Sequence, residues 1–192
     1  VLDQNVRKEA IKSQAEEVAK SLGGEVEIED DLLEEITYLV EYPTAFYGEF
    51  NADYVKLPKE VVTTPMKEHQ RYFPVSKDGK LLPYFIAVRN GDKNGIETVK
   101  AGNEKVLEAR LADALFFYDE DIKKPLESFV ENLKTVVFQA KLGTVYDKTL
   151  RIEKLAADII NSLDEKEALN DTLRAAKLCK ADLVTNMVFE FT

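Results

Sequence analysis

The sequence predicts an α+β fold, in which a sheet-containing module is followed by a helical part. Two apolar runs flank the pair Asp78-Gly79, and this arrangement is typical of a tight β-hairpin. From about Glu97 to the end, apolar residues instead recur at helical spacing. We therefore expect an α+β module over residues 1–128 and an all-α part over residues 129–192.

The first quarter of the chain predicts two helices and a strand. Residues 6–22 carry apolar side chains at helical spacing, and the pair Gly23-Gly24 ends this helix. A second helix follows, with Asp30 or Asp31 as its N-cap. Residues 44–50 alternate between apolar and polar side chains, which favours a strand. A short helix is then expected from Pro58, because proline is favoured in a first turn.

The hairpin is the clearest local signal. Its strands are expected in "RYFPVS" and "LLPYFIAVRN". Pro74 and Pro83 each lack the N–H that a ladder needs, so we expect them at a sheet edge or a strand end. The pairing would bring together, at one end of the hairpin, the polar residues His69, Arg71, Arg89 and Asn90.

The helical part begins with an amphipathic helix over residues 103–121, with Asn103 and Arg110 at the border of its apolar stripe. Residues 144–163 predict a second amphipathic helix, and one or two more follow.

Composition limits the possible functions. Hydrophobic residues make up 45% of the chain and charged residues 32%, which indicates a globular protein. One histidine and one cysteine nearly exclude a zinc site of nitrogen and sulfur ligands. The net charge of −10 argues against a general polyanion binder, although a local basic patch remains possible. No apolar run approaches the roughly 20 residues of a membrane span.

Two residues have competing interpretations. His69 could act as a general base, but only Glu68 is adjacent as an orienting carboxylate, so a solvated or hydrogen-bonded loop histidine is favoured. Arg110 could form an ion pair with Glu104 or Asp113, or it could contact a phosphate. We favour the ion pair, and Lys105 on the same helix would add a second cation for the phosphate alternative.

The last helices resemble those of HD-type phosphohydrolases. In "DKTLRIEKLAADI", Lys148 stands near the position of the first metal-binding histidine. In "AAKLCKADLV", Asp182 matches the aspartate, but Ala181 stands where its histidine would be. Alanine has no ligand atom and a protonated lysine has no free lone pair, so we expect no metal site. Lys148 or Lys180 would suit the holding of a phosphate without its cleavage.

Six blocks in order resemble the β subunit of bacterial glycyl-tRNA synthetase: "LLEEITYLVEYP", "MKEHQRYFPV", "GKLLPYFIAVRN", "GNEKVLEARLADALFFYDED", "LGTVYDKTLRIEKLA" and "CKADLVTNMVFEFT". The resemblance implies an α2β2 assembly, in which the α subunit carries the class II catalytic core and the β subunit binds tRNA. It also implies a B3/B4-like first module and the start of a degenerate HD-like domain. Because the chain starts without methionine and ends on an apolar segment, we expect an internal piece of a longer subunit.

From this resemblance we expect a cytoplasmic ligase subunit without catalytic residues or a cofactor of its own. ATP and Mg²⁺ would enter through the α subunit, and the partners would be that subunit and tRNA(Gly), without a membrane. The candidate RNA-binding residues are Arg71, Arg89, Asn90, Lys105, Arg110, Lys148, Arg151 and Lys180. Two alternatives remain: a purely structural module without RNA contact, and an HD-type metal phosphohydrolase, which the missing ligands disfavour.

Overall fold

The computed structural model describes residues 1–190, so the last two residues of the final family block lie outside the described part. The chain divides into two compact units, Val1–Leu115 and Phe116–Thr192. The helix α4 (Ile96–Ile122) contributes residues to both. We describe each unit by itself, and the assignment of domains to residues 1–128 and 129–192 stays a prediction. Within residues 1–190, no helix has the length and apolar character needed to cross a bilayer.

The helices of the first unit follow the sequence pattern. The helix α1 (Gln4–Ser21) begins after Asp3, whose carboxylate accepts hydrogen bonds from the N–H groups of Asn5 and Val6. The helix α2 (Asp30–Leu39) has Glu29 at its N-cap without a side-chain hydrogen bond, so the predicted caps Asp30 and Asp31 are wrong. Both lie in the first turn instead, where their charge still complements the helix dipole.

The middle of the unit contains short helical segments. These are the 3₁₀ helix η1 (Ala52–Lys56), the helix α3 (Lys59–Thr64) with Pro58 at its N-cap, and a π-helical turn η2 (Pro65–His69).

The sheet has four antiparallel strands in the order β1-β3-β4-β2. Their bounds are β1 Glu25–Val26, β2 Pro43–Glu49, β3 Phe73–Lys77 and β4 Lys80–Asn90. Asp78 and Gly79 join β3 to β4 with φ angles of 51° and 75°, which are the positive values that a tight hairpin turn requires. The predicted hairpin is thus confirmed.

The expectation for the two prolines of the hairpin is wrong. Pro74 and Pro83 lie within β3 and β4, which are the two inner strands of the sheet. The β3–β4 pairing shifts register between Pro74 and Ser76, and this irregularity leaves Pro83 outside the regular ladder. A bulge tolerates proline because the missing N–H has no ladder partner there.

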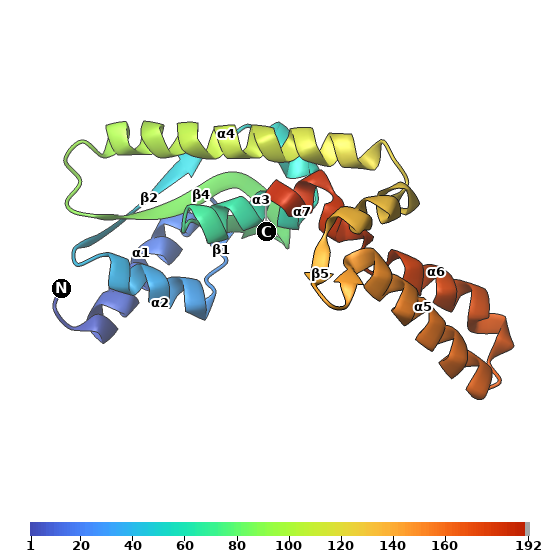
Figure 1. The fold of residues 1–192 in the computed structure, drawn as a ribbon. Coiled ribbons are helices and arrows are strands. Elements are labelled where there is room, and N and C mark those ends of the chain that lie inside the picture. Colours follow the sequence, from blue (N-terminus) through green and yellow to red (C-terminus); the bar gives the residue numbers. More distant parts are fainter. Residues whose placement is uncertain (191–192) are drawn as a thin grey trace. The chain divides into compact units, whose positions relative to one another are not determined.

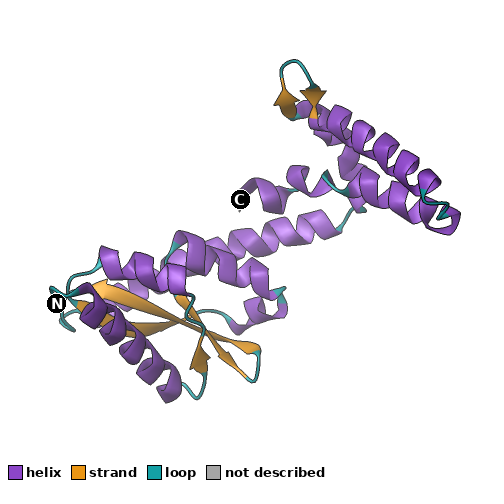
Figure 2. Ribbon diagram, turned by 90° about the horizontal axis from the view of Figure 1, so that it is seen from below, coloured by secondary structure: helices purple, strands orange, loops and turns teal. Residues whose placement is uncertain are grey.

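Helices cover both faces of this sheet, as Figures 1 and 2 show. On one face, α1 and α2 pack with Ile11, Ile36, Phe73, Val75 and Ile86 in one core cluster. On the other face, α4 packs through Leu107 and Leu111 onto a second cluster that contains Phe46, Met66, Tyr72 and Phe85. Alternate residues of β4 therefore enter different cores, as the period of a strand requires.

The second unit is mainly helical. It contains η3 (Leu126–Thr135), α5 (Val145–Ser162), η4 (Lys166–Ala168), α6 (Leu169–Leu178), η5 (Ala181–Val184) and α7 (Asn186–Glu190). The expectation of an all-α part is wrong, because β5 (Val137–Gln139) and β6 (Gly143–Thr144) form an antiparallel pair. A short apolar run does not by itself distinguish a strand from a helix. In addition, Gly143 has a φ of 86°, which is not a helical value, so no helix can continue through this residue.

Candidate functional site

Two of the arginines predicted to bind RNA in the first unit, Arg71 and Arg89, are held by intramolecular contacts. The Nε of Arg71 lies 2.7 Å from Oε1 of Glu35, and the same guanidinium donates to the Glu68 carbonyl. Nη1 of Arg89 donates to the Asn94 carbonyl at 2.7 Å. Both side chains therefore stabilise loops of the unit itself.

Asn90 follows Arg89 at the end of β4, whereas Lys105 lies on α4. Oδ1 of Asn90 accepts the N–H groups of Glu41 and Tyr42, so this residue closes the loop that precedes β2. Lys105 lies on α4 and lines a shallow hollow together with three glutamates, Glu49, Glu104 and Glu108. This acidic surrounding competes with a phosphate for the lysine.

Arg110 does not form the ion pair that we favoured. It lies exposed on α4, and no ion pair to it occurs within residues 1–190. Glu104 instead lies 3.8 Å from Lys100 and accepts the N–H of Glu49. Arg110 lies outside the buried stripe of Leu107, Leu111 and Ala114, and its side chain is exposed to solvent.

Replacement of Arg110 by glutamine should leave the stability of the chain nearly unchanged, within about 0.5 kcal/mol. The reason is that an exposed guanidinium without an ionic partner strands no buried charge when it is removed. Chemical denaturation of the two proteins measures the difference. A loss of several kcal/mol would show that Arg110 has a buried partner.

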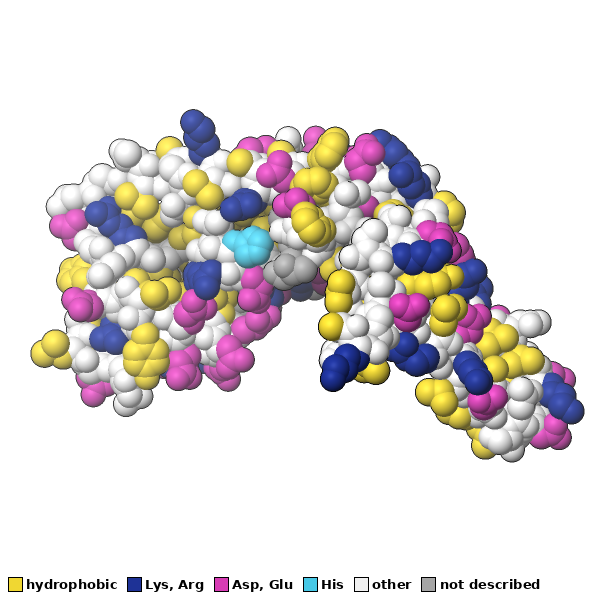
Figure 3. All heavy atoms as spheres, in the orientation of Figure 1, with side chains coloured by type: hydrophobic (Ala, Val, Ile, Leu, Met, Phe, Trp, Pro, Cys, Tyr) yellow, Lys and Arg dark blue, Asp and Glu magenta, His cyan; other side chains and the backbone are white. Residues whose placement is uncertain are grey.

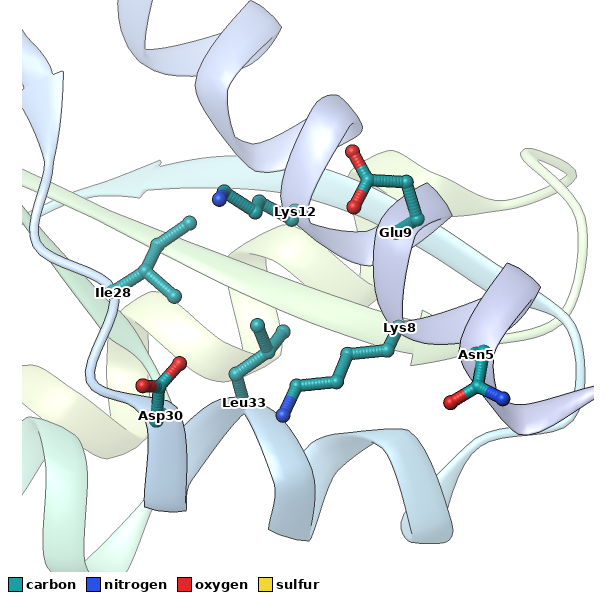
Figure 4. A pocket seen from close by; sticks show the side chains of 7 residues that line it. All are labelled: Asn5, Lys8, Glu9, Lys12, Ile28, Asp30 and Leu33. Carbon is teal, nitrogen blue, oxygen red and sulfur yellow. The ribbon is translucent and has the colours of Figure 1, made fainter.

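The remaining polar sites of the first unit offer no clear chemistry. His69 is the last residue of η2 and is partly buried, with an interaction of its own. A pocket of about 240 Å³ lies between α1 and the segment that leads into α2 (Figure 4), with Lys8 and Lys12 of α1 on one side and Ile28, Asp30 and Leu33 on the other. Its lysines are balanced by Asp30 and by a glutamate on its rim, so it presents no net charge to an anion.

The second unit brings four cations to one short segment. We call residues 134–151 the basic hairpin; it contains β5, β6 and the first turns of α5. Its cations are Lys134, Lys141, Lys148 and Arg151, and its one acidic residue is Asp147. The segment thus has a formal charge of +3 within a chain whose net charge is −10. Figure 3 shows dark-blue side chains beside yellow ones at this hairpin.

The acidic residue of the basic hairpin is used internally. Oδ2 of Asp147 accepts the N–H and the hydroxyl of Thr144, both at 2.8 Å, and the Thr144 hydroxyl accepts the N–H of Asp147 in return. This capping box starts α5. The backbone hydrogen bond from Thr144, then its hydroxyl, and the charge of Arg151 lower the pKa of Asp147. The carboxylate therefore remains ionised as a helix cap and is not directed at a ligand.

The loop of the basic hairpin is fixed in place by further hydrogen bonds. Oε1 of Gln139 accepts the N–H groups of Lys141 and Leu142 at 2.6 and 3.0 Å. Nη1 of Arg151 donates to the Leu142 carbonyl at 3.0 Å. These contacts hold the cations on an ordered frame, which lowers the entropy lost on binding a ligand.

Two aromatic rings lie beneath the cations. Nζ of Lys148 lies 4.1 Å from the centroid of Phe138, and Nζ of Lys134 lies 4.6 Å from that of Tyr146. Lys134 also pairs with Glu131, a hydrogen bond that raises its pKa. Proteins that bind single-stranded nucleic acids combine cations with aromatic rings in this way.

Among the predicted RNA-binding residues, Lys148 and Arg151 share the basic hairpin, whereas the neighbours Arg89 and Asn90 at the end of β4 are each engaged in intramolecular hydrogen bonds. Lys180 lies elsewhere, at the start of η5 and partly buried. The sequence analysis missed Lys134, Lys141 and Phe138. The local excess of positive charge over residues 134–151 could have indicated them, since the rest of the chain is strongly acidic.

The HD-like metal arrangement has no counterpart in the geometry. The stretch "AAKLCKADLV" is not one helix, because α6 ends at Leu178 and Ala181–Val184 form η5. Among residues 1–190, no three side chains of His, Cys, Asp or Glu lie close enough together to hold a metal ion. The absence of a metal in the functional protein stays a prediction.

Fold and side chains together define an α+β protein with a cluster of cations on a short hairpin. The comparison of sequences then specifies the family. The chain belongs to the glycyl-tRNA synthetase beta subunit family, whose model matches residues 1–192.

Curated relatives agree with this assignment. The chain is 75% identical over 191 residues to the glycine–tRNA ligase beta subunit of Clostridioides difficile (strain 630). It is 52% identical over 193 residues to the beta subunits of Desulfitobacterium hafniense (strain Y51) and Moorella thermoacetica. Each alignment covers 100% of this chain and 28% of the relative, so the chain spans about 28% of their length.

Proposed function

We propose that this chain is part of the beta subunit of a cytoplasmic α2β2 glycine–tRNA ligase, and that its basic hairpin contacts the phosphate backbone of tRNA(Gly). The alpha subunit, with ATP and Mg²⁺, would activate glycine, while this part of the beta subunit positions the tRNA and supports subunit assembly. Family membership and the names of the relatives support the ligase. The charge of +3 on an ordered hairpin in an acidic chain supports the RNA contact.

The chemistry of the hairpin favours a backbone contact over catalysis. Lysine and arginine neutralise phosphates, and their contacts fix the orientation of an RNA without reading its sequence. The single carboxylate of the hairpin is held by Thr144, so it neither acts as a base nor repels a phosphate as strongly as a free one would. Each cation thus serves as a positioning contact.

We also assign residues 1–128 to a B3/B4-like module and residues 129–192 to the start of a degenerate HD-like domain. The two-sided packing of helices on an antiparallel sheet supports the first assignment. The packing of α5 against α6 supports the second, with Lys148 on the first of these helices.

The test uses the ligase assembled from the full-length beta subunit that contains this chain and its alpha subunit. The slope of log K against log salt for tRNA(Gly) reflects the number of phosphates that the protein neutralises. Replacement of Lys141 and Lys148 by glutamine should reduce this slope by the amount expected for about two phosphate contacts. Affinity at moderate salt should fall on the order of tenfold. Fluorescence anisotropy with labelled tRNA measures both quantities.

Lys177→Gln is the matched control, because this lysine is exposed on α6 of the same unit and lies outside the basic hairpin. It should leave the salt slope unchanged. An unchanged slope in the double variant as well would overturn the RNA contact and favour the purely structural module.

A further inference from the structure

Phe138 is the feature of the basic hairpin that phosphate binding leaves unexplained. It lies at the centre of β5, where its neighbours Val137 and Gln139 pair with Thr144 and Gly143. Its side chain is 42% exposed, although a large apolar ring is normally buried. The β5–β6 pairing shifts register between Val137 and Gln139, so Phe138 is the extra residue of a β-bulge, a feature that redirects a side chain out of the regular alternation of a strand.

The ring of Phe138 is partly covered by a cation. The ammonium of Lys148 lies 4.1 Å from the ring centroid and therefore over one face. The side chain is still 42% exposed, so part of the ring remains accessible beside this ammonium. The hairpin therefore presents a partly exposed aromatic ring directly beside a positive charge.

This arrangement matches the needs of an unpaired nucleotide. A nucleobase that is not stacked in a duplex gains free energy when it stacks on an aromatic ring, whatever its identity. The phosphates beside it need cations, and Lys141 and Arg151 lie at the loop and on the helix next to the same strand. A base inside a duplex cannot reach the ring without leaving its own stack.

We propose that the basic hairpin holds an unpaired nucleotide, with its base stacked on Phe138 and its flanking phosphates at Lys141, Lys148 and Arg151. This inference rests on the proposed RNA contact and specifies the class of RNA segment bound: a single-stranded loop or end, not a duplex. The interaction tolerates any base, because every base has a π face and the ring offers no hydrogen bond.

The probe is a 12-nucleotide single-stranded RNA that carries 2-aminopurine at its centre, and the comparison is the same strand in a duplex. Binding to the assembled ligase should quench the fluorescence of the single strand, because 2-aminopurine is quenched when it stacks. In Phe138→Leu this quench should disappear, and affinity for the single strand should fall about five- to fiftyfold. The salt slope should stay unchanged, since no charge is removed.

Two further variants control for folding and location. Phe138→Tyr keeps the aromatic face, so it should quench the fluorescence as the parent ligase does. If Phe138 served only to stabilise the hairpin, the quench would not depend on an aromatic ring at this position. Phe116→Leu removes another exposed phenylalanine, 59% accessible on α4, and should have no effect. Thermal unfolding of each variant checks that the chain remains folded.

The outcomes separate this inference from the proposed function. Equal quenching in Phe138→Leu and the parent ligase, with the salt slope still reduced by loss of Lys141 and Lys148, would overturn the stacked nucleotide alone. A salt slope that is insensitive to the lysines would remove the RNA contact itself. Unchanged RNA binding together with loss of the alpha subunit from the Phe138→Leu assembly would assign the ring to a protein interface and also overturn the inference.

Discussion

Replacement of Gly48 by alanine should lower the free energy of unfolding of the chain by about 3 kcal/mol. A Cβ atom at this position would lie 2.2 Å from Cζ and 2.5 Å from Cε1 of Phe85. The Phe85 ring is fully buried and stacks on Tyr72 with centroids 4.5 Å apart, so it cannot move aside without disturbing the core. Chemical denaturation measures the loss.

Gly102→Ala is the control for this substitution. Gly102 lies in α4, and a Cβ there would meet no atom within 4 Å. This change should leave stability unchanged or raise it by up to about 1 kcal/mol, because alanine favours a helix over glycine. The clash has a second signature: Gly48→Ala combined with Phe85→Leu should destabilise by less than the two changes add up to. Additive losses would mean that the two residues do not compete for space.

Replacement of Gly143 by alanine should destabilise the second unit by about 2–3 kcal/mol. Its φ angle of 86° is unfavourable for a residue with a Cβ atom, and that atom would lie 2.3 Å from Oδ2 of Asp147. The carboxylate must then leave the capping box at the start of α5. Hydrogen exchange at the Thr144 amide, which now donates to Asp147, reports this loss directly.

Gly95→Ala separates the two contributions to this loss. Gly95 has a similar φ angle of 69°, but a Cβ atom there would meet no atom within 4 Å. This control should show the backbone strain alone, about 1–2 kcal/mol. If Gly143→Ala and Gly95→Ala have equal effects, and exchange at Thr144 stays slow, the capping box does not depend on the glycine.

Much of the first unit could be predicted from the sequence, because its signals are local. The pair Asp78-Gly79 specified a turn that few other residue pairs can form, and the structure has positive φ angles at both positions. The strand β2 followed from the alternation of residues 44–50. The positions of Pro74 and Pro83 did not follow, because a bulge depends on how two strands align and not on either strand alone.

The candidate site was predicted only in part. Lys148 was identified from the resemblance of its helix to those of HD-type phosphohydrolases and Arg151 as an exposed cation, and the structure places both in the basic hairpin. Arg110 was assigned to an ion pair from its position on a helical wheel, but the structure leaves it exposed and pairs Glu104 with Lys100 instead. Helical spacing determines which residues share a face, whereas the packed partner determines how far that face extends.

The sequence by itself determined the family, the elements of the first unit and the local excess of positive charge, since these depend on residue identity and on neighbours along the chain. Only the tertiary structure decided which cations act together. Lys148 lies over the ring of Phe138, ten residues earlier, and Arg151 bonds to the Leu142 carbonyl, nine residues earlier. Such contacts form where the chain folds back on itself. The capping box at the junction of β6 and α5 fixes the direction in which α5 leaves the hairpin. A short hairpin of weak propensity is stabilised by these contacts, so the hairpin and its cluster of cations form together.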